Sequence, residues 1–186
     1  MGTKGSTMLE PLRRELPPIG YEAVSSSATC SLAPHYESVG GARRFTRSAL
    51  SEWDLDDHFD TVALVVSELV TNALRHALPD ALSAAARQDP AAGTRTAEPA
   101  VRLHLMRWST HLVCAVRDPS RDSPVTGRHL PEDPERAGES GRGLHLVEAF
   151  SDNWGWHPLA GTLRGKVVWA LFRLPALRVR QGPVVT

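Results

Sequence analysis

The chain has 186 residues, and its 21 basic residues balance its 21 acidic residues, so its formal net charge is zero. This length suits a single domain with tails, and the balanced charge excludes the strongly basic surface that typifies nucleic-acid or membrane binding. No apolar run approaches the ~20 residues of a membrane span, and the N-terminus lacks the apolar centre of a signal peptide, so we expect no direct nucleic-acid partner and no membrane attachment.

The first part of the chain is expected to be a tail followed by one domain. Residues 1–24 carry Gly, Pro, Ser and charge without periodicity, which is typical of a disordered segment. We place one domain over residues 25–177 and a C-terminal tail over 178–186. Within the domain, weak alternation predicts a strand over 25–33, and an apolar stripe predicts a helix over 35–52.

The central helix is the clearest element of the sequence. Apolar residues recur at helical spacing through Leu55–Ala77, without Gly or Pro. We expect Asp54 or Asp56 to cap its start, because carboxylates accept from the free N–H groups of a first turn. We expect Pro79 to end it, because proline lacks the N–H that a helix interior requires.

A loop and a hairpin come after the central helix. Residues 79–99 are rich in Ala, Pro and Gly, and we expect a connecting loop with a short helix around 81–87. The segments 101–108 and 111–118 read as two strands. Only two residues separate them, which predicts a hairpin.

The last third of the domain begins with a polar, proline-rich segment, residues 119–140, which we interpret as a lid or an insertion. Helical periodicity returns over 141–150. The segments 153–159 and 166–174 read as a closing pair of strands, and the glycines within 160–165 suit the turn between them.

The order of these elements predicts the fold class. Helices and strands are grouped rather than strictly alternating, which favours an α+β fold over a doubly wound parallel sheet. We expect a two-layer sandwich with helices on one face of a mixed, mostly antiparallel sheet. Cys30 and Cys114 both fall in expected strands. We interpret them as buried thiols rather than a disulfide or metal site, consistent with a reducing cytoplasm.

A polar stripe crosses the central helix. Glu68, Asn72 and His76 are spaced at intervals of four, and each such step advances a helix by about 40° beyond a full turn. An ordinary solvated stripe explains this pattern as well as a site does. As a site, the carboxylate would orient a water or hydroxyl, and the amide oxygen would help to hold Mg²⁺. One amide suffices for Mg²⁺ only if a nucleotide supplies phosphate oxygens.

Two further stretches are candidates for ligand contacts. Asp118 ends a strand, where a carboxylate is most often a turn residue but can also accept from an exocyclic amine such as that of adenine. Residues 138–144 contain three glycines and lead directly into a helix, whose N-terminal N–H groups attract phosphate. Arg142 in this run could reach a terminal phosphate. A glycine loop alone is a weak signal.

Taken together, these stretches resemble the GHKL (Bergerat-fold) ATP-binding superfamily, and within it the small anti-sigma factor serine/threonine kinases. SELVTNALRHA is similar to the N-box of that family. SGRGLHLVEAFSDNWGW, followed by GKVVWALF, is similar to its phosphate-loop box and closing strands. The resemblance covers about residues 25–175 and implies the Bergerat, or histidine-kinase-like ATPase, fold.

The resemblance implies a role for each candidate residue, with ATP and Mg²⁺ as cofactors. Glu68 would be the general base for a target serine, Asn72 would coordinate Mg²⁺, and Asp118 would bind the adenine amine. His76 would support the ATP site. The phosphates would be wrapped by the residues of the glycine-rich run, which are Gly141, Arg142, Gly143 and Leu144.

The chain departs from the family pattern after Asp118. The family motif there is Asp-x-Gly-x-Gly, whereas this chain continues with Pro119, Ser120, Arg121 and Asp122, so both glycines are absent. Val167 or Val168 also stands where relatives often carry a hydroxyl near adenine.

Three functions are compatible with these patterns. The resemblance implies an anti-sigma factor that sequesters a sigma factor and phosphorylates a serine of a small anti-anti-sigma partner, with a possible homodimer through the first strand and helix. The altered loop favours the alternative of a catalytically weak or inactive binding module that acts by sequestration. The catalytic domain of a histidine kinase is a third reading, disfavoured by the lack of room for a dimerising helical pair.

Overall fold

A computed structural model describes residues 24–85, 101–120, 122–124, 142–159 and 165–175. The side chains of residues 76–85 and of Arg142 lie outside this description. The expected tails, almost all of the expected lid over 119–140 and most of the loop before the hairpin also lie outside it, so those expectations stay predictions.

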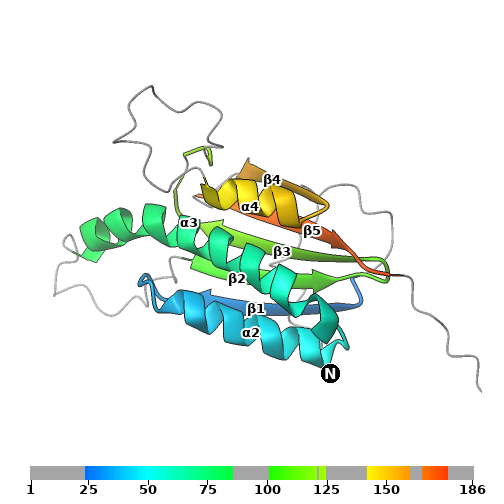
Figure 1. Ribbon diagram of the computed structural model, residues 1–186. Coiled ribbons are helices and arrows are strands. Elements are labelled where there is room, and N and C mark those ends of the chain that lie inside the picture. The colour runs from blue at the N-terminus through cyan, green and yellow to red at the C-terminus, as the bar shows by residue number, and fades with distance from the viewer. Residues whose placement is uncertain (1–23, 86–100, 121, 125–141, 160–164, 176–186) are drawn as a thin grey trace, which may run out of the picture.

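Five antiparallel strands form one sheet in the order β1-β2-β3-β5-β4 (Figure 1). The strands are β1 (Ser26–Leu32), β2 (Val101–Arg107), β3 (His111–Asp118), β4 (Asn153–Pro158) and β5 (Lys166–Arg173). The last strand along the chain therefore lies between β3 and β4. This arrangement pairs the end of β3 with the start of β5.

The α-helices in the described part of the chain cover one face of this sheet (Figure 1). They are α2 (Ser38–Glu52), α3 (Phe59–Ala85) and α4 (Arg142–Phe150), and a short 3-10 helix, η1 (Asp56–His58), precedes α3. The expected α+β sandwich with helices on one face is thus confirmed. Every strand pair in the described residues is antiparallel, so the sheet there is not mixed as we had allowed.

The main core lies between the helices and the sheet. Alternate strand residues point into it, such as Leu103 and Leu105 on β2 and Cys114 and Val116 on β3. The helix α3 supplies the largest share of its buried residues. Two strands at the centre of the sheet, β2 and β3, are buried on both faces over most of their length.

The central helix differs from its prediction at both ends. It continues past Pro79 to Ala85, so the expected stop at Pro79 is wrong. Proline removes one hydrogen bond from a helix interior, and the alanine-rich sequence after it has the intrinsic preference to resume the helix. The expected caps are also wrong, because Asp56 belongs to η1 and Asp54 adopts a left-handed backbone with φ of 56° before it.

The other elements agree with their predictions to within a few residues. The strand pair over 101–118 forms the expected hairpin, closed by a 2.8 Å hydrogen bond from the N–H of Trp108 to the carbonyl of His111. The helix expected over 35–52 begins at Ser38, after the chain leaves β1. None of the helices in the described part of the chain is long and apolar enough to cross a membrane.

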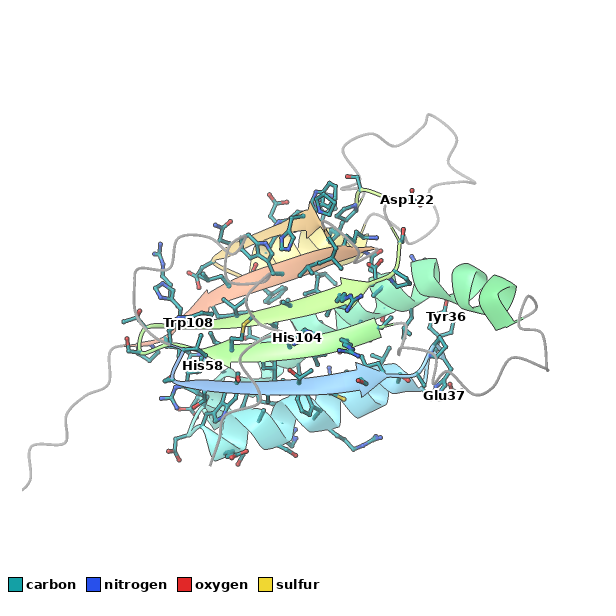
Figure 2. All side chains as sticks on the ribbon, turned by 180° about the vertical axis from the view of Figure 1, so that it is seen from behind. Tyr36, Glu37, His58, His104, Trp108 and Asp122 are labelled. Carbon is teal, nitrogen blue, oxygen red and sulfur yellow. The ribbon has the colours of Figure 1, made fainter. Side chains whose placement is uncertain are left out.

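The opposite face of the sheet carries a second apolar cluster. It is formed by Met106, Trp108, Val113, Ala115, Val167, Trp169 and Leu171. Figure 2 views this face and shows His104 near its centre. His104 is buried, shares a 3.0 Å hydrogen bond with the hydroxyl of Thr29, and has its pKa lowered to about 4 by burial and then by Arg102 and Arg117.

Candidate functional site

The structure describes the side chains of two members of the polar stripe on the central helix. Glu68 and Asn72 are both partly exposed on α3, whereas Leu69, Val70 and Ala73 beside them are buried. His76 also lies on α3, but its side chain is outside the described residues. The first two members of the stripe therefore interrupt a helix that is otherwise largely buried, which leaves their polar groups within reach of a ligand.

Glu68 lies against the start of α4. A Cβ atom built on Gly143 would be only 2.7 Å from Glu68 Oε2, so the absence of a side chain at Gly143 allows this approach. Gly143 is the second residue of α4. The N–H groups of a first helical turn have no partner within the helix and carry partial positive charge. The carboxylate of Glu68 and the N-terminus of α4 are thus brought together from residues 75 positions apart.

The remaining residues of the expected phosphate loop are only partly described. Gly141 and the side chain of Arg142 are outside the described residues. Leu144 is buried in the main core beneath α4. Its side chain therefore anchors the helix, and only its backbone N–H is available for the phosphate contact that we expected of it.

Asp118 lies at the end of β3 and is almost completely buried, with 1% of its surface exposed. It is two residues after Val116 on the same strand, so it points to the face that the helices cover. Its Oδ1 atom accepts a 2.8 Å hydrogen bond from the N–H of Ser120. This bond forms a local turn and fixes the orientation of the carboxylate.

Lys166 is a site residue that we did not predict from the sequence. It is the cross-strand neighbour of Asp118, its exposure is also 1%, and its Nζ donates to Asp118 Oδ1 at 3.1 Å. Two buried charges are tolerated because they are paired and hydrogen bonded. One signal was available in the sequence, since Lys166 is the only lysine besides Lys4.

The strand register also revises the expectation for the two valines. Val167 belongs to the apolar cluster on the opposite face of the sheet, so it does not share the face of Asp118. Val168 does face the main core, but its cross-strand partner is Val116. The position opposite Asp118 is neither of these valines but Lys166, whose ammonium group donates to the carboxylate.

Gly165 holds the start of β5 against the end of β3. Its φ is +108°, and a Cβ atom built there would lie 2.0 Å from the carbonyl oxygen of Asp118 and 2.9 Å from Cα of Pro119. Only glycine is compatible with such a φ and such a close backbone approach. Gly165 thereby keeps Lys166 directly opposite Asp118.

The loop after Asp118 forms turns without the two glycines of the family motif. Besides the Ser120 bond to Asp118, the N–H of Asp122 donates to the hydroxyl of Ser120 at 3.1 Å. Among the described residues, Asp54 is the only one other than glycine with a positive φ. Ser120 and Asp122 therefore use side-chain hydrogen bonds rather than left-handed backbone to turn the chain.

We treat these residues as two ends of one candidate site, because α3, which carries Glu68, packs against β3, β5 and α4, which carry the other residues. We call Glu68 and Gly143 the phosphate end, and Asp118 and Lys166 the base end. The phosphate end fits ATP with Mg²⁺, since it combines a carboxylate, the nearby amide of Asn72 and the start of a helix. The base end offers a fixed carboxylate, but this carboxylate already accepts a hydrogen bond from an internal cation.

Comparison with known families agrees with this geometry. The family model described as "Histidine kinase-like ATPase domain" matches residues 32–171, well over half of the chain. This match covers all of β2, β3 and β4, β5 as far as Leu171, and only the last residue of β1. Both ends of the candidate site lie within it. No curated protein matches the chain.

Proposed function

Because the chain belongs to the histidine kinase-like ATPase family, whose members are GHKL ATPases, we propose that it is an ATP- and Mg²⁺-dependent protein serine/threonine kinase of the anti-sigma type. An ATPase domain of this family implies ATP binding and regulatory kinase or ATPase activity. The finer proposal names the acceptor, a serine of a small anti-anti-sigma partner, and the sequestered protein, a sigma factor.

The observation that carries this proposal is the approach of Glu68 to the start of α4. Phosphoryl transfer depends mainly on positioning and on neutralising charge. A carboxylate beside free helical N–H groups supplies both a proton acceptor and a place for phosphate oxygens. The 2.7 Å separation between Glu68 Oε2 and the Cβ position of Gly143 puts these two functions side by side.

Each residue has a defined part in the proposed reaction. Bound ATP would supply the phosphoryl group. Glu68 accepts the proton of the target serine hydroxyl, and the amide oxygen of Asn72 contributes to a Mg²⁺ site that phosphate oxygens complete. Asp118 accepts a hydrogen bond from the exocyclic amine of adenine. The backbone of Gly143 and Leu144, with Gly141 and Arg142, holds the phosphates.

A second function is favoured by the base end of the site. Asp118 already accepts from Lys166 in a buried pair, so a chain with low affinity for nucleotide could still bind and sequester a partner. In this alternative, the fold acts as a binding module, and phosphorylation plays no part. Neither function requires a membrane or a nucleic-acid surface, and both are compatible with a cytoplasmic location.

The first test is a calorimetric titration with ATP, with and without Mg²⁺. We expect binding that requires Mg²⁺ and that Asn72→Ala weakens by about tenfold or more, the equivalent of one hydrogen bond to a charged group. Asn153→Ala, which removes an exposed amide on β4, is the matched control. An absence of binding at millimolar ATP would leave the sequestering module as the function.

The second test concerns Glu68 alone. With labelled ATP and a purified candidate partner, Glu68→Gln should lower phosphoryl transfer by about a hundredfold or more, the typical contribution of a general base. Its affinity for ATP should remain close to that of the wild type. Glu52→Gln, an exposed position at the end of α2, is the control. Transfer that persists in Glu68→Gln would remove Glu68 from the role of base.

A further inference from the structure

The buried pair of Asp118 and Lys166 leads to one inference beyond the proposed function, on which it rests for the role of Asp118. Both side chains have 1% exposure, and Lys166 Nζ lies 3.1 Å from Asp118 Oδ1. Oδ1 also accepts from the N–H of Ser120. The oxygen that fixes the carboxylate in place thus already carries two donors.

We propose that Lys166 is an internal competitor for the base-binding carboxylate, which the amine of adenine must displace when ATP binds. The ammonium group of Lys166 donates to the same carboxylate of Asp118 to which an exocyclic amine would donate. Lys166 therefore determines how strongly a nucleotide must bind before it can displace the ammonium group. It favours ligands that can donate to Asp118 over those that cannot.

The competition arises from the chemistry of the two donors. A hydrogen bond between two charged groups is roughly twice as strong as one between neutral groups, so a neutral amine does not displace an ammonium group on that bond alone. Displacement succeeds only if Lys166 reaches water, because an unpaired buried charge is strongly unfavourable. Its flexible four-carbon stem allows the ammonium group to move while the backbone stays in place.

The backbone around Asp118 and Lys166 is rigid, so the movement that displaces the ammonium group is confined to the side chain of Lys166. Gly165 approaches the carbonyl of Asp118 too closely for any other residue, and its own carbonyl accepts from the N–H of Leu159 at 2.8 Å. Lys166 is also the register partner of Asp118 where β3 pairs with β5. The start of β5 is therefore held, and only the side chain of Lys166 is free to exchange partners.

The scarcity of lysine in this chain provides a direct test. In a Lys4→Arg background, Lys166 is the only lysine, so its modification by an amine-reactive ester can be followed on its own peptide by mass spectrometry. Without ligand, we expect slow modification, because the ammonium group is buried and paired. Saturating ATP with Mg²⁺ should raise the rate by about tenfold or more, whereas purine riboside triphosphate, which has the same phosphates but no exocyclic amine, should not.

Affinity supplies the second measurement. Lys166→Met should bind ATP about tenfold more tightly than the wild type in calorimetry, because the competitor is gone. Lys4→Met lowers the net charge equally and should bind like the wild type. The labelling experiment leaves Lys166 in place, so it remains decisive even if Lys166→Met folds poorly.

The outcomes separate this inference from the function on which it rests. If ATP binds the wild type, but Lys166 stays protected and Lys166→Met binds no more tightly, the inference is wrong and the ATP-binding function stands. If neither the wild type nor Lys166→Met binds ATP at millimolar concentration, the proposed function fails, and the inference fails with it.

Discussion

The two ends of the candidate site use glycine in different ways. At the phosphate end, the nearest atom to a Cβ on Gly143 is Oε2 of Glu68, the tip of a flexible side chain. At the base end, the nearest atom to a Cβ on Gly165 is the backbone carbonyl oxygen of Asp118. A side chain can move aside, whereas paired strands cannot. The phosphate end is therefore adaptable, and the base end is rigid.

The carboxylates at the two ends of the candidate site, Glu68 and Asp118, also differ in their exposure to solvent. Glu68 is partly exposed and can meet an approaching substrate, whereas Asp118 is buried and paired with Lys166. An exposed carboxylate suits proton transfer from the serine of a partner protein, because that serine must approach from outside. A buried carboxylate with an internal partner suits selection, because a ligand must offer a better contact than the one already present.

The largest effect should come from alanine at the rigid end. Gly165→Ala should destabilise the fold by about 4 kcal/mol or more, because it combines an unfavourable positive φ with a backbone clash at 2.0 Å. Thermal and urea unfolding measure this loss.

The matched control is Gly41→Ala within α2, where the nearest atom to the new Cβ is Arg44 Nη2 at 3.9 Å. It should be neutral or stabilise the helix by about 0.5 to 1 kcal/mol. Equal stabilities for Gly165→Ala and Gly41→Ala would show that the base end is not rigid.

Breaking the buried pair should have the next largest effect. Asp118→Asn should lower the free energy of unfolding by about 3 kcal/mol, because the ammonium group of Lys166 loses the counter-ion with which it pairs in the folded protein. Denaturant unfolding at pH 7 checks this value.

The exposed pair of His35 and Glu37 offers the comparison, since its side chains are 57% and 85% exposed. Glu37→Gln should change stability by less than about 0.5 kcal/mol. If Asp118→Asn lowered the free energy of unfolding as little as Glu37→Gln, the buried pair would contribute no more to stability than a surface ion pair does. The base end would then resemble the phosphate end.

The free energy of unfolding should depend on pH through His104, which lies on the opposite face of the sheet from both ends of the candidate site. His104 has a pKa of about 4 in the folded protein against an ordinary 6.5, so the unfolded chain binds this proton more readily. Its contribution to stability is complete above about pH 6.5 and is lost as the pH falls toward 4. The loss should not exceed about 3 kcal/mol.

This effect is measured as the difference in unfolding free energy between the wild type and His104→Gln at pH 7.5 and pH 4.5. The advantage of the wild type should shrink at the lower pH. A difference that is independent of pH would mean that His104 is not held neutral by its surroundings.

The smallest effect on stability should come from alanine at the adaptable end. Gly143→Ala should cost less than about 1 kcal/mol, because the tip of Glu68 can rotate away from the new Cβ. The same rotation removes the carboxylate from its place, so phosphoryl transfer should fall while the unfolding midpoint barely changes. A loss of stability comparable to that of Gly165→Ala would contradict the comparison between the ends.

Much of this fold could be predicted from local patterns, and the errors have identifiable causes. Alternation located the strands of the sheet, and helical spacing placed Glu68 and Asn72 on α3, where both are partly exposed. Pro79 was misjudged, because the effect of a proline on a helix depends on the residues after it, and here an alanine-rich segment continues the helix. The caps were misjudged, because η1 intervenes between the two helices.

Lys166 could not be assigned to the site from local pattern. From the sequence alone, a lysine that follows a glycine at the start of a strand is expected to be exposed to solvent, because lysine is rarely buried. Its role depends on the pairing of β5 with β3, which joins residues 48 positions apart. The sequence pointed instead to Val167 or Val168, one and two residues away, and a shift of one residue in a strand reverses the face.

The sequence by itself determined the order of the elements and the family, and it predicted the residues of the phosphate end, because periodicity and short motifs are local properties of the chain. Only the tertiary structure decided that β5 lies beside β3, that Glu68 meets Gly143 and that Lys166 neutralises Asp118. The reason is physical. Strand register and helix packing are set by contacts between distant segments, and a buried charge is acceptable only where those contacts supply its partner.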